Sequence, residues 1–394
     1  MELSFKQLKF IEKDDYVKVL FLNIFSFNIE KKSLLKIGKY KINNNSIEFD
    51  NPNPEKKFNL LIDNGLNNLT NIISGNKTIF IHSNSSIPLI GSNSFGLVDR
   101  NTNLIELKPI TSCNLNCTFC SVDEGKDTKK SLDFVVEKDY LIEEFKKLAS
   151  YKNVDPLYAY INVHGEPMLY EPLIELIKDL KEIDNVIVGL ITNGTFLNHD
   201  MIDKLSSAGL DRINISLSAI DQDIASKLAN APFNVNRLLE MIEYANTKLE
   251  VVIAPVFLHG INDNEMPKIL DFSKKIRNDK GFPLVGIQNF LSYKLGRNPV
   301  KEYPFDKFKE KLKEWNANIE DDFYKIIETK KLIKPFKKND IIECEIISND
   351  RYKGQSLAKA SDRIITIFSE VNIGKKVKVK ILKDKHNIFV GKVL

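Results

Sequence analysis

Three of the four cysteines in this sequence lie within eight residues of one another. Cys113, Cys117 and Cys120 have the spacing Cys-x3-Cys-x2-Cys and follow closely on an apolar run. Three thiolates on one short loop can ligate three irons of a cubane [4Fe–4S] cluster and leave the fourth iron without a protein ligand. A structural zinc site would need a fourth ligand in reach. The spacing therefore favours an iron–sulfur cluster with one open coordination position.

The fourth cysteine, Cys344, is expected to have a different role. It alternates with Ile342 and Ile346 along a β-type run, and a period of two places all three on one face of a strand. This predicts a position in a hydrophobic core. The clustering of the other three cysteines also argues against a disulfide framework and favours a metal in a reducing compartment.

The composition is typical of a globular protein outside the membrane. The chain has 394 residues, 43% of them hydrophobic and 28% charged, and this length suggests two or three domains. The first residues show no basic region followed by an apolar one, so no signal peptide is expected. The most apolar early run, residues 17–27, is too short to span a bilayer. We therefore expect a cytoplasmic protein with no membrane partner.

Six apolar runs alternate with amphipathic segments in the middle of the chain. The runs are Leu104–Lys108, Leu157–Val163, Val186–Thr192, Arg212–Ser218, Leu249–Phe257 and Leu284–Leu291. The amphipathic segments are Asp139–Ala149, Pro172–Lys181, Asp200–Ala208, Val235–Asn246 and Glu265–Arg277. This alternation predicts an α/β fold with a parallel sheet. Because six units are too few for a closed eight-fold barrel, we expect a partial (βα)6 barrel with its site at the carboxyl ends of the strands.

The flanking regions are typical of two further domains. Residues 1–100 mix β-type runs with Asn-rich breaks, which predicts a small N-terminal α/β or β-rich domain of no readable function. A helical stretch at 305–327 and a linker near 330–335 follow the central region. Four more β-type runs then predict a small β-barrel: Asp340–Ile347, Arg363–Phe368, Lys376–Leu382 and Ile388–Val393. We expect domains at 1–100, 101–330 and 335–394.

Small and polar residues follow the second and third expected strands. Gly165 lets the backbone approach a ligand, and the carboxylate of Glu166 can accept a hydrogen bond. The alternative is an ordinary strand-to-helix turn, since the next residue is Pro167 and proline favours early helical positions. His164 precedes them, facing either a substrate or the protein interior. Thr192 and Asn193 form a polar pair at the end of the third strand.

The fourth expected strand carries polar residues on one face. A period of two places Asn214, Ser216 and Ser218 on the same side of the sheet. Three polar residues on one face of a strand would be unusual if that face packed in a dry interior. They fit a face that lines a polar cavity.

The cysteine spacing after the first strand, with these strand-end residues in this order, resembles the radical S-adenosylmethionine (SAM) superfamily over residues 104–291. The resemblance implies that the open iron binds SAM through its amino and carboxylate groups. Electron transfer into the sulfonium then releases methionine and a 5′-deoxyadenosyl radical, which abstracts a hydrogen from the substrate. An electron donor is therefore an implied partner.

The resemblance also implies roles for individual residues. Phe119 matches the aromatic residue that packs near the adenine of SAM, and Gly165-Glu166-Pro167 matches the element at the methionine end. The polar residues of the third and fourth strands match positions that contact ribose and carboxylate. The implied SAM contacts are Phe119, Gly165, Glu166, Thr192, Asn193, Ser216 and Ser218. No catalytic acid or base can be named, and His164 departs from the glycine that many relatives carry.

The charge of the chain is uneven. Residues 335–394 contain thirteen Lys or Arg and seven Asp or Glu, a net of +6, whereas the whole chain carries +4. Lys376, Lys378 and Lys380 alternate with apolar residues, so the period of two predicts a stripe of lysines on one outer face. Such a stripe suits a phosphate backbone. The alternatives are a solvated lysine-rich surface or an edge strand protected by lysines.

The segment from Lys338 to Val393 also resembles the TRAM domain, a small OB-like RNA-binding barrel found on RNA-modifying enzymes. The match rests on Asn339-Asp340, on residues 354–358 and on residues 374–377. The family more often has Gly-x-Gly-hydrophobic-Ala where this chain has Gln355 and Ser356. The resemblance implies RNA as a partner, tRNA in particular.

Together the two resemblances imply an RNA-modifying transferase similar to archaeal-type tRNA-modifying radical SAM proteins. Methylthiolating enzymes of this kind need three further cysteines upstream, and no cysteine precedes Cys113. Adenosine C-methylases and wyosine-type enzymes also use extra cysteines. We therefore expect C-methylation or another carbon functionalisation with a single cluster. An enzyme acting on a protein side chain or a cofactor precursor, and an RNA-binding redox sensor, stay open as alternatives.

Overall fold

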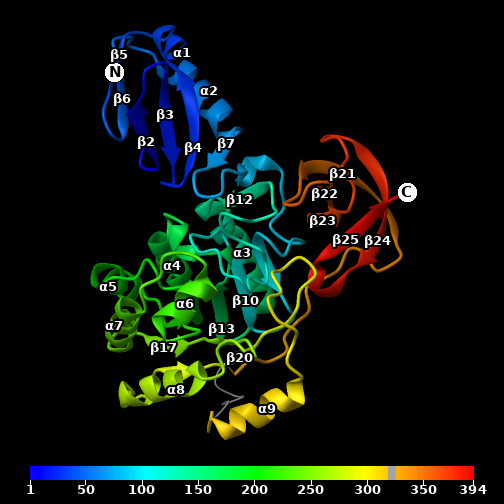
Figure 1. Ribbon diagram of the computed structural model, residues 1–394. Coiled ribbons are helices and arrows are strands. Elements are labelled where there is room, and N and C mark those ends of the chain that lie inside the picture. Colours follow the sequence, from blue (N-terminus) through cyan, green and yellow to red (C-terminus); the bar gives the residue numbers. More distant parts are fainter. Residues whose placement is uncertain (318–324) are drawn as a thin grey trace.

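The centre of the molecule is a mixed sheet of seven strands. The computed structural model describes residues 1–317 and 325–394 (Figure 1). The strands lie in the order β19-β17-β16-β15-β13-β10-β9. Their bounds are β9 (Gly96–Asp99), β10 (Leu104–Lys108), β13 (Leu157–Ile161), β15 (Val186–Thr192), β16 (Arg212–Ile215), β17 (Glu250–Ile253) and β19 (Leu284–Val285). The last six are parallel to one another, and β9 pairs antiparallel at the edge.

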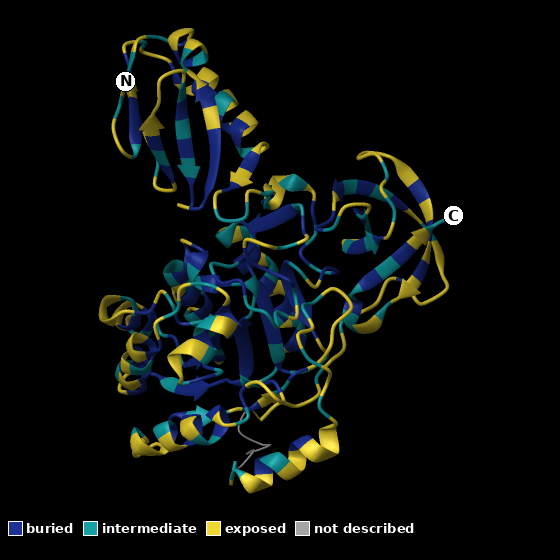
Figure 2. Cartoon of the chain, viewed as in Figure 1, coloured by how far each residue is buried: buried dark blue, intermediate teal, exposed yellow. Residues whose placement is uncertain are grey.

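Helices connect the parallel strands. They are α3 (Lys138–Lys152), α4 (Leu173–Lys181), α5 (His199–Ser207), α6 (Gln222–Ala229), α7 (Val235–Asn246) and α8 (Glu265–Lys275). Each buries one apolar stripe; in α4 the buried residues are Leu173, Leu176, Ile177 and Leu180. That spacing is the helical period of a face packed on a sheet. Figure 2 shows the resulting pattern, with buried strands inside and exposed outer helix faces.

The expected parallel sheet is confirmed, and the details of the expected units differ. The fifth run is interrupted after β17 because Pro255 has no N–H to give to the ladder, and β18 (Val256–Phe257) resumes beyond it. The sixth run is likewise divided into β19 and β20 (Gln288–Asn289), and β18 pairs with β20. Helix α6 was not expected; it is short and begins at a capping aspartate, Asp221. The exact (βα)6 layout stays a prediction.

Two sheets make up the N-terminal region. A small sheet contains β1 (Glu2–Ser4), β5 (Tyr40–Ile42) and β6 (Ser46–Phe49). The larger sheet contains β2 (Leu8–Glu12), β3 (Tyr16–Phe21), β4 (Phe25–Glu30), β7 (Leu69–Asn71), β8 (Lys77–Ile81) and β12 (Leu132–Val136), accompanied by α1 (Lys31–Leu35) and α2 (Glu55–Leu66). Two strands cross the boundary expected near residue 100: β9 joins the central sheet, and β12 returns to pair with β8.

The C-terminal residues form a closed five-stranded barrel, which confirms the expected small β-barrel. Its strands are β21 (Ile341–Asn349), β22 (Ser356–Ala360), β23 (Arg363–Ile367), β24 (Lys376–Lys383) and β25 (Phe389–Val393), in the order β21-β22-β23-β25-β24. Cys344 is buried in the barrel core with Ile346 and Phe389, as expected. Before the barrel, α9 (Phe305–Glu314) occupies the start of the expected helical stretch, while residues 318–324 lie outside the described residues.

The barrel docks closely on the rest of the molecule. Ile364 N–H donates to the carbonyl of Ile90 at 2.9 Å, and Ser131 N–H donates to the carbonyl of Arg351 at 2.9 Å. At Gly91, a Cβ atom would lie 2.4 Å from both the backbone nitrogen and the oxygen of Ile364. Backbone of the two regions therefore meets at a distance that only glycine permits.

No helix in the part of the chain that the structure describes has both the length and the apolar character needed to cross a membrane.

The close approach at Gly91 leads to a prediction. Gly91→Ala is expected to lower the free energy of unfolding by more than about 2 kcal/mol. The φ of Gly91 is +124°, and the new Cβ would meet backbone that cannot rotate away. Gly354→Ala is the matched control: its φ is also positive, but nothing lies within 4 Å, so only about 1 kcal/mol of strain is expected. Thermal unfolding and protease sensitivity between residues 330 and 335 measure the difference. Equal effects of the two changes would contradict the tight docking.

Candidate functional site

The loop that carries Cys113, Cys117 and Cys120, called the cysteine loop below, is held beside the end of the second parallel strand by a backbone contact. Ser112 in β11 (Thr111–Ser112) pairs with Gly165 in β14 (His164–Gly165). Gly165 has φ +143°, and a Cβ atom there would lie 1.8 Å from the carbonyl oxygen of Ser112. Only glycine allows this approach. It brings Cys113, the next residue, against the Gly-Glu-Pro element.

A cavity of about 350 Å³ opens at this place. The wall includes the three clustered cysteines and six of the seven residues expected to bind SAM. These nine are Cys113, Cys117, Phe119, Cys120, Gly165, Thr192, Asn193, Ser216 and Ser218. The wall also has apolar residues, among them Phe233, Val256, Phe290 and Leu291. Residues from distant parts of the chain therefore form one pocket that has both polar and apolar walls.

Glu166 lies behind the cavity wall and is fully buried. Its Oε1 accepts hydrogen bonds from Thr192 Oγ1 (2.6 Å) and Met168 N–H (3.0 Å), and its Oε2 accepts one from Asn193 N–H (2.7 Å). A carboxylate has about four acceptor positions, so one on Oε2 is left for a ligand. The main visible role of Glu166 is to orient the end of β15, and its expected direct contact with SAM stays a prediction.

Asn193 connects that strand end to the cysteine loop. Its Nδ2 donates to Asn114 Oδ1 at 2.9 Å and lies 3.8 Å from Cys113 Sγ. The side chain of Asn114 in turn donates to Thr195 Oγ1 at 2.8 Å. The loop is therefore fixed at its first cysteine by the third parallel strand.

Arg297 fixes the loop at its second cysteine, and sequence reasoning missed it. Its Nη1 donates to the carbonyls of Asn116 (2.8 Å) and Cys117 (3.1 Å), and its Nε contacts Asp123 at 2.7 Å. Arg297 lies in a loop after β20, far along the chain from the cysteines. No local pattern marks it, because only the fold brings the two loops together.

Two residues near the strand ends lie away from the cavity. His164 is absent from the wall, and its Nε2 lies 3.5 Å from Asn93 Nδ2. Burial, followed by nearby cations, lowers its pKa well below the ordinary value, so the ring is neutral. Asn214 is buried on β16, while Ser216 and Ser218 on the same face reach the cavity. Ser218 also accepts a hydrogen bond from Val256 N–H at 3.1 Å.

The donor set fits an iron–sulfur cluster with SAM. Burial raises the pKa of Cys113 well above its ordinary range and that of Cys117 to about 12, so these thiols need a metal cation to become thiolates at neutral pH. Within the described residues, no three His, Cys, Asp or Glu side chains are placed to hold a single metal ion. A cubane cluster would instead distribute the three thiolates over three irons and leave the fourth iron open to SAM.

Comparison with known proteins identifies the family. Residues 107–273 match the Radical SAM superfamily. An uncharacterized protein of Methanocaldococcus jannaschii is 37% identical over 374 residues, covering 86% of this chain and 85% of that protein. This chain belongs to the radical SAM superfamily. As a member of this superfamily, the enzyme uses a [4Fe–4S] cluster and SAM.

More distant relatives match only parts of this radical SAM enzyme. The GTP 3′,8-cyclase of Staphylococcus epidermidis is 30% identical over 173 residues, which cover 41% of this chain and about half (48%) of that enzyme. The structure of Streptococcus suis SuiB bound to S-adenosylmethionine has 14% identity and a TM-score of 0.43, covering 79% of this chain and 69% of that one. A likeness of that size does not bear on substrate.

The chain's own residues prepare the site for the chemistry. The bound cluster supplies the electron that cleaves SAM. The three cysteines would ligate it, while Asn193 and Arg297 keep the cysteine loop in place. Gly165 opens the backbone beside the first cysteine, and the apolar residues of the cavity wall would limit water around a reactive radical.

The single triad leads to a prediction of metal content. Reconstituted protein is expected to contain about four irons per chain, because three thiolates ligate one cubane cluster. Cys117→Ala is expected to lose most of this iron. Cys344→Ala is the matched control and should keep it, because that thiol lies in the barrel core. Iron and sulfide analysis measures both, and about eight irons per chain, as two clusters would give, would contradict the prediction.

The burial of Glu166 leads to a prediction of pH dependence. Burial raises its pKa from 4.5 to about 7, with the three donors acting in the opposite direction. Because the folded-state pKa is the higher one, the contribution of this group to stability is complete below pH 4.5 and is lost as the pH rises through about 7. Glu166→Gln should abolish the part of the pH dependence of stability that Glu166 contributes. It should also lower the free energy of unfolding by about 1–3 kcal/mol, because the amide NH2 of the glutamine would face the N–H of Asn193. Chemical unfolding between pH 4 and 8 compares the two proteins, and parallel curves would refute the assignment.

Proposed function

We propose that this radical SAM enzyme modifies RNA, tRNA in particular, and that the C-terminal barrel, which resembles a TRAM domain, binds the nucleic acid. The proposal adds a substrate to the family's chemistry. Four features support it: the lysines of the barrel, the contact between barrel and cavity rim, the supply of cysteines and the name of one relative.

The lysine stripe lies on the outside of the barrel. Lys376, Lys378 and Lys380 are exposed on β24 and alternate with buried Val377 and Val379. Strand β24 pairs with β21 on one side and with β25 on the other. It is therefore not an edge strand, and protection of an edge does not explain its lysines.

Neighbouring carboxylates reduce the charge of the stripe at one end. On β21, Glu345 lies opposite Lys376 and Glu343 opposite Lys378. At the other end, Lys380 faces Lys392 of β25. The positive potential is therefore expected to be strongest around this last pair, where a phosphate backbone would bind best.

The observation that carries the proposal is the contact between the barrel and the rim of the cavity. The hydroxyl of Tyr352, in the loop that joins β21 and β22, donates to the carbonyl of Leu295 at 3.2 Å. Leu291 and Tyr293, from the same segment as Leu295, line the cavity. The barrel proposed to hold the nucleic acid is therefore in contact with the rim of the cavity, which supports a macromolecular substrate.

The cysteines and one relative narrow the chemistry. Cys344 is buried in the barrel core, so the triad is the set of cysteines available for a cluster in this sequence. This supports carbon functionalisation, such as C-methylation, rather than methylthiolation. The name of the GTP 3′,8-cyclase places that relative's reaction on a nucleotide, which supports a nucleotide substrate here.

A second candidate is an enzyme that acts on a protein side chain or a cofactor precursor. The pairing of Glu343 and Glu345 with the lysine stripe favours it, because it reduces the charge available for RNA. The barrel would then present a different substrate to the same cavity.

Comparison of tRNA nucleosides by mass tests the first candidate. A strain lacking this enzyme is expected to lose one modified nucleoside. The wild-type gene should restore it, whereas a Cys117→Ala variant should not, because it cannot hold the cluster. Unchanged tRNA nucleosides would refute the tRNA proposal and favour the second candidate.

The lysine stripe leads to a prediction of salt dependence. Replacement of Lys376, Lys378 and Lys380 by alanine is expected to weaken tRNA binding and to lower the slope of log K against log salt by about 1 to 3, because one to three phosphate contacts are lost. A control with the same loss of charge replaces Lys36, Lys56 and Lys57, which are exposed in the N-terminal region. Filter binding at several salt concentrations measures the slopes. An equal loss in both triple variants would contradict a specific surface on the barrel.

A further inference from the structure

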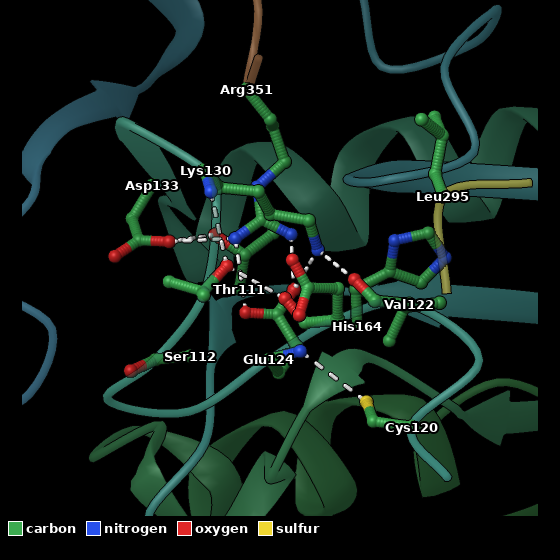
Figure 3. Close-up of polar contacts among 12 residues, drawn as sticks. Thr111, Ser112, Cys120, Val122, Glu124, Lys130, Asp133, His164, Leu295 and Arg351 are labelled. Atoms are coloured by element: carbon green, nitrogen blue, oxygen red, sulfur yellow. Dashed lines mark hydrogen bonds and ion pairs between the residues drawn. The ribbon is translucent and has the colours of Figure 1, made fainter. Parts of the chain in front are cut away.

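An arginine of the barrel enters the interior of the neighbouring region. Arg351 lies in the loop between β21 and β22, yet only 2% of its side chain is exposed. Its guanidinium binds both carboxylate oxygens of Glu124 and contacts Asp133 Oδ1 at 2.7 Å (Figure 3). Its Nε donates to the carbonyl of Leu132 at 3.1 Å. Its charged donors are thus directed at residues outside the barrel.

One of these partners belongs to the cysteine loop. The backbone N–H of Glu124 donates to Cys120 Sγ at 3.3 Å, and Glu124 is one of the residues that line the cavity. Figure 3 shows the resulting chain of contacts, from the guanidinium through the carboxylate to the sulfur. The barrel is therefore one residue away from the third cluster ligand.

Four buried charged side chains meet where the barrel contacts the cysteine loop, and their charges balance only when the barrel is docked. Glu124, Asp133, Lys130 and Arg351 are each at most 3% exposed, and Lys130 Nζ contacts Glu124 Oε1 at 2.6 Å. Without Arg351, one buried cation would face two buried carboxylates. A buried charge without its partner is strongly unfavourable, so the cysteine loop and β12 depend on the barrel for their last charge.

We propose that Arg351 is a positioning residue through which the barrel sets the environment of the cluster ligand Cys120. By holding the carboxylate of Glu124 at both oxygens, Arg351 fixes the backbone N–H that donates to the sulfur. Hydrogen bonds to cluster sulfurs are among the features that set the reduction potential. Because a donor stabilises the more negative reduced cluster, this N–H raises the potential and favours reduction. The role concerns the cluster itself and does not depend on which substrate the enzyme modifies.

The reduction potential of the holoenzyme tests this role. Arg351→Met is expected to lower the equilibrium constant for one-electron reduction about tenfold, which is about 59 mV, because one hydrogen bond to a charged sulfur is weakened. A titration followed by electron paramagnetic resonance measures it. Asp133→Asn is the control: it removes the charge of another buried partner of Arg351 but leaves the contact with Glu124, so it should lower stability and shift the potential much less than Arg351→Met does.

Two further measurements keep the test decisive. Arg351→Lys keeps the charge but cannot bind both oxygens, so it should fold and give an intermediate shift, even where Arg351→Met does not fold. In metal-free protein, hydrogen exchange of the Glu124 amide should be faster in either Arg351 variant than in the wild type. A wild-type potential in the Arg351 variants, or an equal shift in Asp133→Asn, would overturn the proposal.

Discussion

The site depends on one close backbone contact, between Gly165 and the carbonyl of Ser112. It aligns β11 with β14 and so holds the cysteine loop against the ends of the parallel strands. No side chain can be added at Gly165 without driving the two segments apart, because the obstacle is backbone rather than a movable side chain. The rest of the cavity forms around this contact: the strand ends contribute polar groups, and the loop contributes sulfur.

Around that contact, buried polar side chains hold the cysteine loop in place, because the loop has no regular secondary structure to make it rigid. Glu166 organises the end of β15, Asn193 reaches from there to the first cysteine, and Arg297 holds the carbonyls beside the second. Each is oriented by several hydrogen bonds, which restrict it more than one contact would. An irregular loop can therefore present three thiols in a fixed arrangement, as a cluster with one open iron requires.

The C-terminal barrel is part of this arrangement rather than a module on a flexible tether. It meets the central region through backbone at Gly91, through a hydroxyl at Tyr352 and through the buried charge of Arg351. The same barrel carries the exposed lysines of β24. The surface proposed to bind a polyanion and the charge that completes the cysteine loop thus belong to one small domain.

The sequence by itself determined the chemistry and the order of elements. Cysteine spacing, the Gly-Glu-Pro element and the alternation of apolar runs are local patterns, and the parallel sheet, the barrel and the core position of Cys344 followed from them. Tertiary structure alone decided that Glu166 lies behind the cavity wall, that β12 returns to the N-terminal sheet, and that Arg297 and Arg351 reach the cysteine loop. These contacts join residues far apart in the chain. Periodicity reports which face of an element is buried, whereas the partner of a buried charge is set only when separate elements pack together.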